Sequence, residues 1–355
     1  MSIFHRHKLL IALGIMICLA GLSACNPQET ALSSKPTQWR FAIEETVGSV
    51  QHQYALKFKE LVEARSDGQI VVTIYPYGTL GTSEQITEQI DMGVIQFAMA
   101  SPGHLGKMIP EVQVFLLHFL FSDDDEINNQ VLNEAPKLRQ AFNELYARKN
   151  FKLLSIFSEG WQVWTTKKAI QTPADFKGVK MRVMTSPLLL AAYQGYGASP
   201  TPLPYSEVYS ALQLNMIDGQ ENPVFAIQEM SFYEVTDWMI FARHAPFITT
   251  SVTNLDFFNS LPPERQQLVT EVVGELNDYI LDVQKRFNQE RLALIRKNKP
   301  KLKIITELTP EQREAFRQAS QPVREQFVEM TGEDGRQLLE LLKATIKDYE
   351  SQREN

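Results

Sequence analysis

Cysteine and histidine are both scarce in this chain of 355 residues. Only two cysteines, Cys18 and Cys25, and six histidines are present. Both cysteines fall within the first 25 residues, and Cys18 lies inside a segment that we expect to be removed. The rest of the chain therefore has no pair of thiols for an internal disulfide.

Motifs of common enzymes and cofactor-binding folds are missing as well. There is no phosphate-binding loop, no His-Glu-x-x-His, no Cys-x-x-Cys and no Gly-x-Ser-x-Gly. Gly195 and Gly197 have the spacing that opens a dinucleotide-binding loop. They follow a predicted helix, however, and Pro200 replaces the third glycine, so helix termination explains them better. We expect no cofactor and no enzymatic activity.

The histidines show no metal-ligand spacing. His104, His118 and His244 are scattered along the sequence, far from the short separations that are typical of zinc-binding motifs. We interpret each of them as a packing or surface histidine and expect no metal site.

An excess of positive charge is also absent. The formal net charge is −7, and loss of the N-terminal segment, which contains Arg6 and Lys8 but no acidic residue, makes it more negative. Nucleic-acid binding needs basic patches, so this balance argues against a nucleic-acid partner. A small anion held in a local basic pocket remains compatible with it.

The first 25 residues have the pattern of a secretory leader. His5–Lys8 is basic, and Leu9–Leu22 is an apolar run that is too short for a stable membrane span. The run ends in Ser23-Ala24-Cys25, which resembles a bacterial lipobox, so we expect lipidation of Cys25 and a membrane anchor. An ordinary cleaved signal that happens to end near a cysteine is the alternative. Asn26–Gln38, rich in Pro, Ser, Thr and Gln, is predicted to be a flexible tether.

Strand and helix patterns alternate after the tether. Trp39–Ile43 and Ile70–Tyr75 are predicted strands, and a helical pattern with Phe58 on its apolar face lies between them. This βαβ opening predicts an α/β fold with a parallel-rich sheet and helices on both faces. Pro263 to about Asn298 is an unusually long helical stretch that can brace two lobes.

Arg182 is the charged residue that most needs an explanation. It lies in an apolar strand setting, where a charged side chain requires a partner. A structural salt bridge to Glu159 or Glu207 is one explanation. A ligand carboxylate is the other, because the planar guanidinium can give a carboxylate two parallel hydrogen bonds. Spacing alone does not decide between them.

Three further candidates have ordinary structural explanations. Tyr205 and Trp161 are aromatic residues of the kind that more commonly packs in a core. Asn222 precedes Pro223 and can simply shape a turn.

Four short motifs follow one another along the chain. They are Tyr75-Pro76-x-Gly78-x-Leu80-Gly81, Gly178-x-Lys180-Met181-Arg182, Ser206-Glu207-Val208-Tyr209-x-Ala211-Leu212-Gln213 and Asp218-Gly219-Gln220-Glu221-Asn222-Pro223. In content, order and spacing they closely resemble the DctP-type solute-binding proteins of tripartite ATP-independent periplasmic (TRAP) transporters. The resemblance implies an α/β, two-lobed fold like that of periplasmic binding proteins, with a long helix bracing both lobes.

The resemblance also implies a division of the chain. The expected parts are a lipoprotein signal (1–25), a tether (26–38), lobe one (39–159 plus about 248–287) and lobe two (160–247 plus about 288–355).

Site residues follow from the same resemblance. Arg182 matches the arginine that pairs with a ligand carboxylate, Asn222 the asparagine that supports it, and Tyr205 an aromatic against the ligand body. Gln162, next to the candidate Trp161, stands where many members have a second arginine. Glu45, at the end of the first strand, is near a ligand-contacting position, and an acid there can receive an ammonium group. Gln162, Glu45 and Trp161 complete the expected ligand-binding set.

The implied function is capture of a small organic acid outside the cytoplasm and its delivery to an ion-gradient-driven TRAP permease. The ligand is expected to be a carboxylate, for example a four-carbon dicarboxylate. A zwitterion such as ectoine or an amino acid is the alternative, because Gln162 removes a second anionic anchor and Glu45 adds an acid. A ligand-sensing module for a receptor kinase, an enzyme and a purely structural lipoprotein are the rival classes.

Overall fold

The computed structural model describes residues 35–354. The expected signal segment, Cys25 and most of the expected tether lie outside the described residues. The chain from Thr37 onward forms one compact unit. No helix within residues 35–354 is long and apolar enough to cross a membrane.

The first sheet has five strands in the order β2-β1-β3-β10-β4. Its strands are β1 (Thr37–Ala42), β2 (Ile70–Tyr75), β3 (Phe97–Ala100), β4 (Phe151–Trp161) and β10 (Pro246–Asn254). β1 pairs in parallel with β2 and β3, as the βαβ pattern predicts, whereas β10 runs antiparallel to both β3 and β4. This sheet is therefore mixed.

The second sheet has six strands in the order β11-β9-β5-β8-β6-β7. Its strands are β5 (Val163–Thr166), β6 (Lys180–Val183), β7 (Ser199–Pro202), β8 (Gly219–Asn222), β9 (Trp238–Ile240) and β11 (Lys303–Ile305). β6 is parallel to β7 and β8, but β5 is antiparallel to β8 and β9. β11 is parallel to β9. Both sheets therefore contain parallel and antiparallel pairs, because the chain passes directly from β4 into β5 and from β9 into β10 without a crossover helix.

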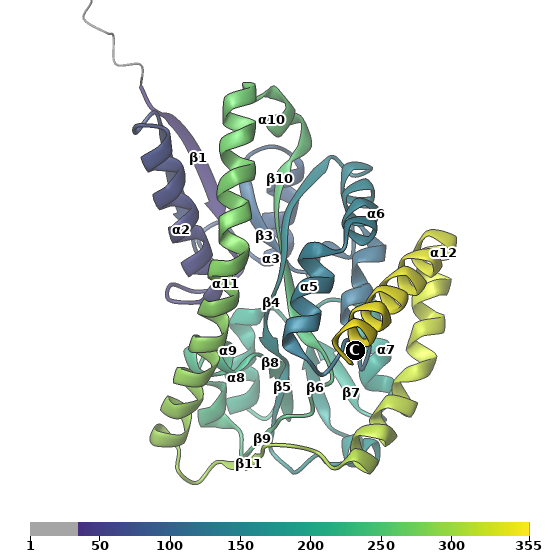
Figure 1. Cartoon of the computed structure of the whole chain (residues 1–355). Coiled ribbons are helices and arrows are strands. Elements are labelled where there is room, and N and C mark those ends of the chain that lie inside the picture. The colour runs from purple at the N-terminus through teal and green to yellow at the C-terminus, as the bar shows by residue number, and fades with distance from the viewer. Residues whose placement is uncertain (1–34, 355) are drawn as a thin grey trace, which may run out of the picture. The chain divides into compact units, whose positions relative to one another are not determined.

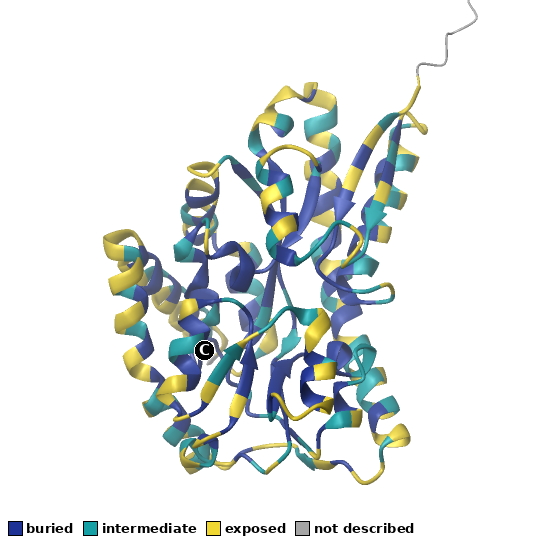
Figure 2. Ribbon diagram, turned by 180° about the vertical axis from the view of Figure 1, so that it is seen from behind, coloured by how far each residue is buried: buried dark blue, intermediate teal, exposed yellow. Residues whose placement is uncertain are grey.

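Helices cover both sheets (Figure 1). The α-helices are α2 (Val50–Arg65), α3 (Ser83–Asp91), α4 (Pro102–Leu105), α5 (Asp125–Glu134), α6 (Pro136–Ala147), α7 (Pro187–Gly195), α8 (Val208–Gln213), α9 (Val224–Glu229), α10 (Leu255–Ser260), α11 (Pro263–Asn298) and α12 (Pro310–Glu354). The 3₁₀ helices are η1 (Pro110–Leu116), η2 (Pro173–Phe176), η3 (Tyr205–Glu207) and η4 (Phe232–Val235). The strands are largely buried, while the exposed positions gather on the outer faces of the helices (Figure 2).

The long helix α11 has the predicted bounds and links the cores of the two sheets. Val272, Leu276 and Ile280 belong to the core cluster that includes β1 and β2 residues. Ile295, near the other end, belongs to a second cluster with β5 and β9 residues. Figure 1 shows α11 passing from α2 to α9. The expected α/β, two-lobed fold with a long bracing helix is confirmed, and each lobe is built on one of the two mixed sheets.

The last helix, α12, is interrupted. It begins with the reciprocal contacts of a capping box, in which Gln312 N donates to Thr309 Oγ1 and Thr309 N to Gln312 Oε1. Gly332 then adopts φ 67° and ψ −146°, so the segment is two helices joined at a bend. Phe327 and Leu342, on either side of Gly332, join a core cluster with Phe142 of α6. The exact boundaries of the two lobes stay a prediction.

Candidate ligand-binding site

Arg182 lies on β6, between β8 and the edge strand β7 of the second sheet, and is 2% exposed. Nε and Nη2 both donate to the carbonyl oxygen of Leu203, at 3.1 and 2.9 Å. Burial lowers the pKa of the guanidinium. Arg182 forms no ion pair within residues 35–354, so neither Glu159 nor Glu207 neutralises it there. A buried guanidinium whose hydrogen-bond acceptor is neutral keeps an unpaired positive charge. It is therefore a suitable binding group for an anion.

A cavity surrounds this guanidinium, and its walls come from elements of both sheets. It encloses about 30 Å³, less than a small organic molecule occupies, so a ligand requires some opening of the walls. The lining residues are Glu44, Glu45, Gln51, Ser83, Ser101, His104, Arg182, Met184, Tyr205, Asn222 and Phe247.

Two carboxylates from the turn after β1 line the same cavity. Glu44 and Glu45 are both buried. Glu44 accepts a hydrogen bond from the backbone N of Ser101 at 2.8 Å, yet burial raises the pKa of Glu44 to about 7. Burial, and then the nearby carboxylate of Glu159, raise the pKa of Glu45 well above its ordinary value. A ligand cation near these acids would stabilise their ionised forms.

Glu159 is a third buried carboxylate in this region. Its Oε1 accepts a hydrogen bond from Gln51 Nε2 at 3.0 Å, and the backbone N of Gln51 donates to Glu45 Oε2 at 3.3 Å. Burial raises the pKa of Glu159 as well. Gln51, in the first turn of α2, therefore contacts both acids. Glu159 lies behind Gln51 and Glu45 without lining the cavity, and it forms no ion pair with Arg182.

Tyr205 and Asn222 also line the cavity, as expected for ligand-binding residues. Tyr205 begins η3, and its ring packs edge-on against Tyr77 and Phe232, with ring centres 5.8 Å apart in both cases. Asn222 is the last residue of β8, and its Nδ2 donates to Gln220 Oε1. These contacts fix an aromatic face and a carboxamide beside Arg182.

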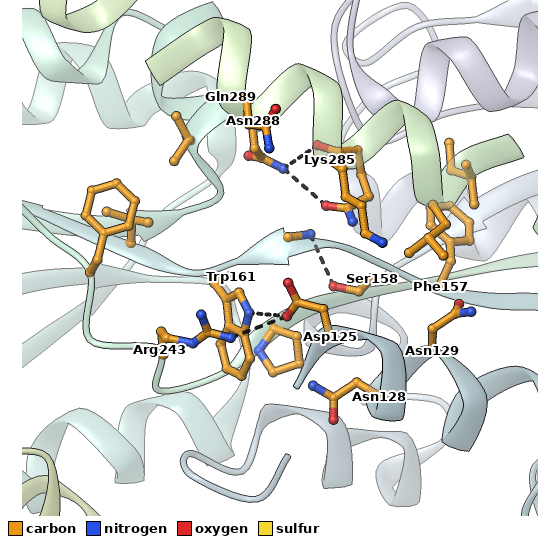
Figure 3. Close-up of a pocket in the computed structure, with 18 of the residues that line it drawn as sticks. Asp125, Asn128, Asn129, Phe157, Ser158, Trp161, Arg243, Lys285, Asn288 and Gln289 are labelled. Carbon is orange, nitrogen blue, oxygen red and sulfur yellow. Dashed lines mark hydrogen bonds and ion pairs between the residues drawn. The ribbon is translucent and has the colours of Figure 1, made fainter. Parts of the chain in front are cut away.

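Trp161 faces a different cavity, of about 280 Å³, which is shown in Figure 3. Its Nε1 donates to Asp125 Oδ1 at 2.6 Å, and the guanidinium of Arg243 lies 4.6 Å from the centre of its ring. Arg243 is also 3.5 Å from Asp125. The charges of Asp125 and Arg243 are thus already paired, in contrast to Arg182. The structure does not bring Trp161 to the Arg182 cavity.

Gln162 is next to Trp161 in sequence but lines a third, smaller cavity together with His118 and Glu221. It does not line the cavity around Arg182. His104 does line that cavity, whereas His118 and His244 lie together beside Glu221. Their proximity was not predictable from the sequence, because the two histidines are far apart along the chain.

Several residues that line the Arg182 cavity were not predicted from the sequence. Among them are Glu44, Gln51, Ser101 and Phe247. One signal was available for Glu44, since it lies beside the candidate Glu45 directly after a buried strand. Ser101 follows β3 in the same way, at the end of a parallel strand where binding groups commonly gather. Gln51 and Phe247 carried no such signal.

The two mixed sheets, the bracing helix and a buried cavity lined by elements of both sheets are features of a binding protein for a small solute. Residues 41–331 match the DctP family, described as bacterial extracellular solute-binding protein, family 7. The chain belongs to this family, as the motifs predict, and it is a solute-binding protein and not an enzyme.

Named relatives carry more specific descriptions. The chain is 42% identical to the ectoine/5-hydroxyectoine-binding periplasmic protein UehA of Ruegeria pomeroyi, covering 87% of this chain and 90% of UehA. It is 31% identical to the C4-dicarboxylate-binding periplasmic protein DctP of Shewanella loihica, covering 84% and 88%. The solved structure of the periplasmic ectoine-binding protein of the TeaABC TRAP transporter of Halomonas elongata matches with a TM-score of 0.85 at 39% identity, covering 88% and 99%.

Proposed function

We propose that this protein captures a small zwitterion of the ectoine class outside the cytoplasm and delivers it to a TRAP permease. The observation that carries the proposal is the distribution of charge in one cavity. Arg182 lies on β6 without a carboxylate partner in the described chain, and Glu44 and Glu45 line the same cavity from the turn after β1. A molecule with a carboxylate and a delocalised cation complements both ends.

A dicarboxylate complements this cavity less well. Its second carboxylate would approach either the buried acids or neutral groups, and like charges in a site of low polarity repel strongly. Gln162 stands at the position where a second arginine would bind another anionic group of the ligand. Its side chain is neutral and lines another cavity. The relatives named as ectoine binders are 42% and 39% identical, against 31% for the named dicarboxylate binder. The zwitterion therefore replaces the dicarboxylate as our preferred ligand.

Tyr205 and Phe247 complete the proposed site. Both line the cavity of Arg182. A delocalised cation binds favourably against an aromatic face, and the apolar part of a compact ring fills the space between the charged ends. Asn222 Nδ2 would donate one hydrogen bond to the ligand carboxylate. The ligand would enter with the cavity walls moved apart, and it would then hold elements of the two sheets together, because its contacts come from both.

Anchoring and transport complete the proposal. Lipidation of Cys25 would hold the protein at a membrane surface in the periplasm. The tether would be shorter than expected and end before Thr37, because Thr37 and Gln38 belong to β1. The relatives are named as periplasmic proteins, and one belongs to a TRAP transporter, which favours a TRAP permease as the membrane partner.

A comparison of ligands by calorimetry and thermal unfolding tests the proposal. The purified protein is first unfolded and refolded to remove any bound solute, and then titrated with ectoine, 5-hydroxyectoine, an amino acid, succinate and a sugar acid. Ligand at a hundred times its dissociation constant stabilises the fold by about 2.7 kcal/mol. We expect saturable binding of the ectoines. Tight binding of succinate with no effect of ectoine would overturn the choice of ligand.

A further inference from the structure

We propose that His118, Glu221 and His244 form a binding site for one divalent transition-metal ion, with Zn²⁺ as the best match. They come from three distant segments: His118 follows η1, Glu221 is on β8, and His244 precedes β10. One potential ligand atom from each lies within 4.8 Å of the other two. The three residues are only 3%, 4% and 1% exposed.

The chemistry of this donor set suits zinc. Two imidazole nitrogens and one carboxylate oxygen are a common protein ligand set for Zn²⁺, which binds them at about 2.0 to 2.2 Å. His244 Nε2 is already 2.8 Å from Glu221 Oε2. An ion would replace this direct contact, and the carboxylate would supply part of the compensating negative charge.

The outer contacts resemble those that orient metal ligands. The hydroxyl of Tyr196 lies 2.7 Å from His118 Nδ1, which leaves Nε2 as the nitrogen available to an ion. The hydroxyl of Tyr193 donates to Glu221 Oε2. The ring of Trp164 stacks on that of His244 with centres 4.6 Å apart. Such partners hold ligand rings and carboxylates in place around a metal.

One unsatisfied polar atom points to an occupant. Gln162 Oε1 is buried and has no hydrogen-bond partner in the described chain. Unpaired buried polar atoms are costly, so each one calls for an explanation. Gln162, His118 and Glu221 line one cavity of about 10 Å³, close to the space of one water-sized sphere. An ion there would gain Gln162 Oε1 as a fourth, oxygen ligand.

The proposed metal site adjoins the solute site. Ser101, Met184 and Phe247 line both the small cavity and the cavity of Arg182. The metal proposal is independent of which solute binds, because none of the three ligands lines the Arg182 cavity.

Metal analysis of the protein, prepared without a polyhistidine tag, tests the proposal. The protein is stripped with a chelator, equilibrated with Zn²⁺, passed through a desalting column and measured for bound zinc. We expect one zinc ion per chain, and a visible absorption band of tetrahedral Co²⁺ when Co²⁺ is used instead. His118→Ala and His244→Ala should each abolish stoichiometric binding. His52→Ala, a histidine on α2 that donates no ligand to this site, is the matched control and should retain it.

Tyr196→Phe separates positioning from ligation. It removes the hydroxyl at His118 but no ligand, so zinc should bind about 10- to 100-fold more weakly with one site still present. The proposal is overturned if the wild-type protein retains no zinc and gives no Co²⁺ band, which would leave an ordered water as the occupant. It is also overturned if His52→Ala loses as much metal as His118→Ala. Should a histidine variant not fold, the wild-type Co²⁺ spectrum decides by itself.

Discussion

The guanidinium of Arg182 gives two hydrogen bonds to a single acceptor, the carbonyl oxygen of Leu203, from Nε and Nη2. Leu203 lies just after β7, the strand that pairs in parallel with β6. The protein thus orients the arginine with a neutral group and leaves its charge for the ligand. This arrangement underlies the first prediction.

Replacement of Arg182 by alanine should weaken solute binding by about 2 to 5 kcal/mol, or roughly 30-fold to several thousand-fold. Arg182→Lys should restore little, because an ammonium group cannot give a carboxylate two parallel hydrogen bonds. Calorimetric titration measures both variants. Arg286→Ala, in which the replaced side chain is exposed on α11, is the matched control. Unchanged affinity in folded Arg182→Ala would show that the ligand carboxylate binds elsewhere.

Glu45→Gln tests the acidic end of the site. It keeps the size of the side chain and removes the charge that a ligand cation would meet, so affinity for ectoine should fall by about 1.5 to 3 kcal/mol. Affinity for a monocarboxylate that carries no cationic group should change little. Glu60→Gln, an exposed acid on α2, serves as the control in the same titrations. Equal losses for ligands with and without a cation would contradict a charge-specific role for Glu45.

Glu44 predicts a pH effect on the stability of the ligand-free protein. Its folded pKa is raised from 4.5 to about 7, so the folded state favours the protonated acid. Protonation of Glu44 therefore adds to the free energy of unfolding, by at most about 3 kcal/mol. This stabilisation is fully present below pH 4.5 and is lost as the pH rises toward 7. Glutamine mimics the protonated form at every pH. Urea unfolding should therefore show Glu44→Gln gaining stability relative to wild type between pH 5 and pH 8. A difference that is constant with pH would mean that Glu44 is ionised in the fold.

Replacement by alanine should have opposite effects on stability at Gly332 and Gly274. Gly332 has φ 67° and ψ −146°, a conformation largely restricted to glycine, and Gly332→Ala should destabilise the fold by about 1 to 3 kcal/mol. Gly274 lies inside α11, and Gly274→Ala should stabilise it by up to about 1 kcal/mol. A Cβ atom at either position meets no other atom within 4 Å, so only the backbone distinguishes them. Thermal unfolding of both variants checks the signs, and a stabilised Gly332→Ala protein would show that α12 can straighten.

Much of the local structure depends on residues that are close together in the sequence. The bounds of α11 and the capping box at Thr309 follow from proline, side-chain caps and hydrophobic periodicity, which act within a few residues. The motifs around Arg182, Tyr205 and Asn222 likewise named three residues that the fold brings to one cavity. The mixed direction of the strands was not predictable in this way, since antiparallel pairing of β4 with β10 joins residues about a hundred positions apart.

The sequence by itself determined the family, the helices and the arginine of the site, because these depend on motifs and on local backbone preferences. Only the tertiary structure decided which side chains share a cavity. Trp161 and Gln162 are neighbours along the chain but line different cavities. Glu45 and Glu159 both meet Gln51, and His118 lies beside His244, although no sequence spacing links them. Contacts between such distant residues depend on how strands from the two halves of the chain pair and pack. That packing is determined by burial of the whole core.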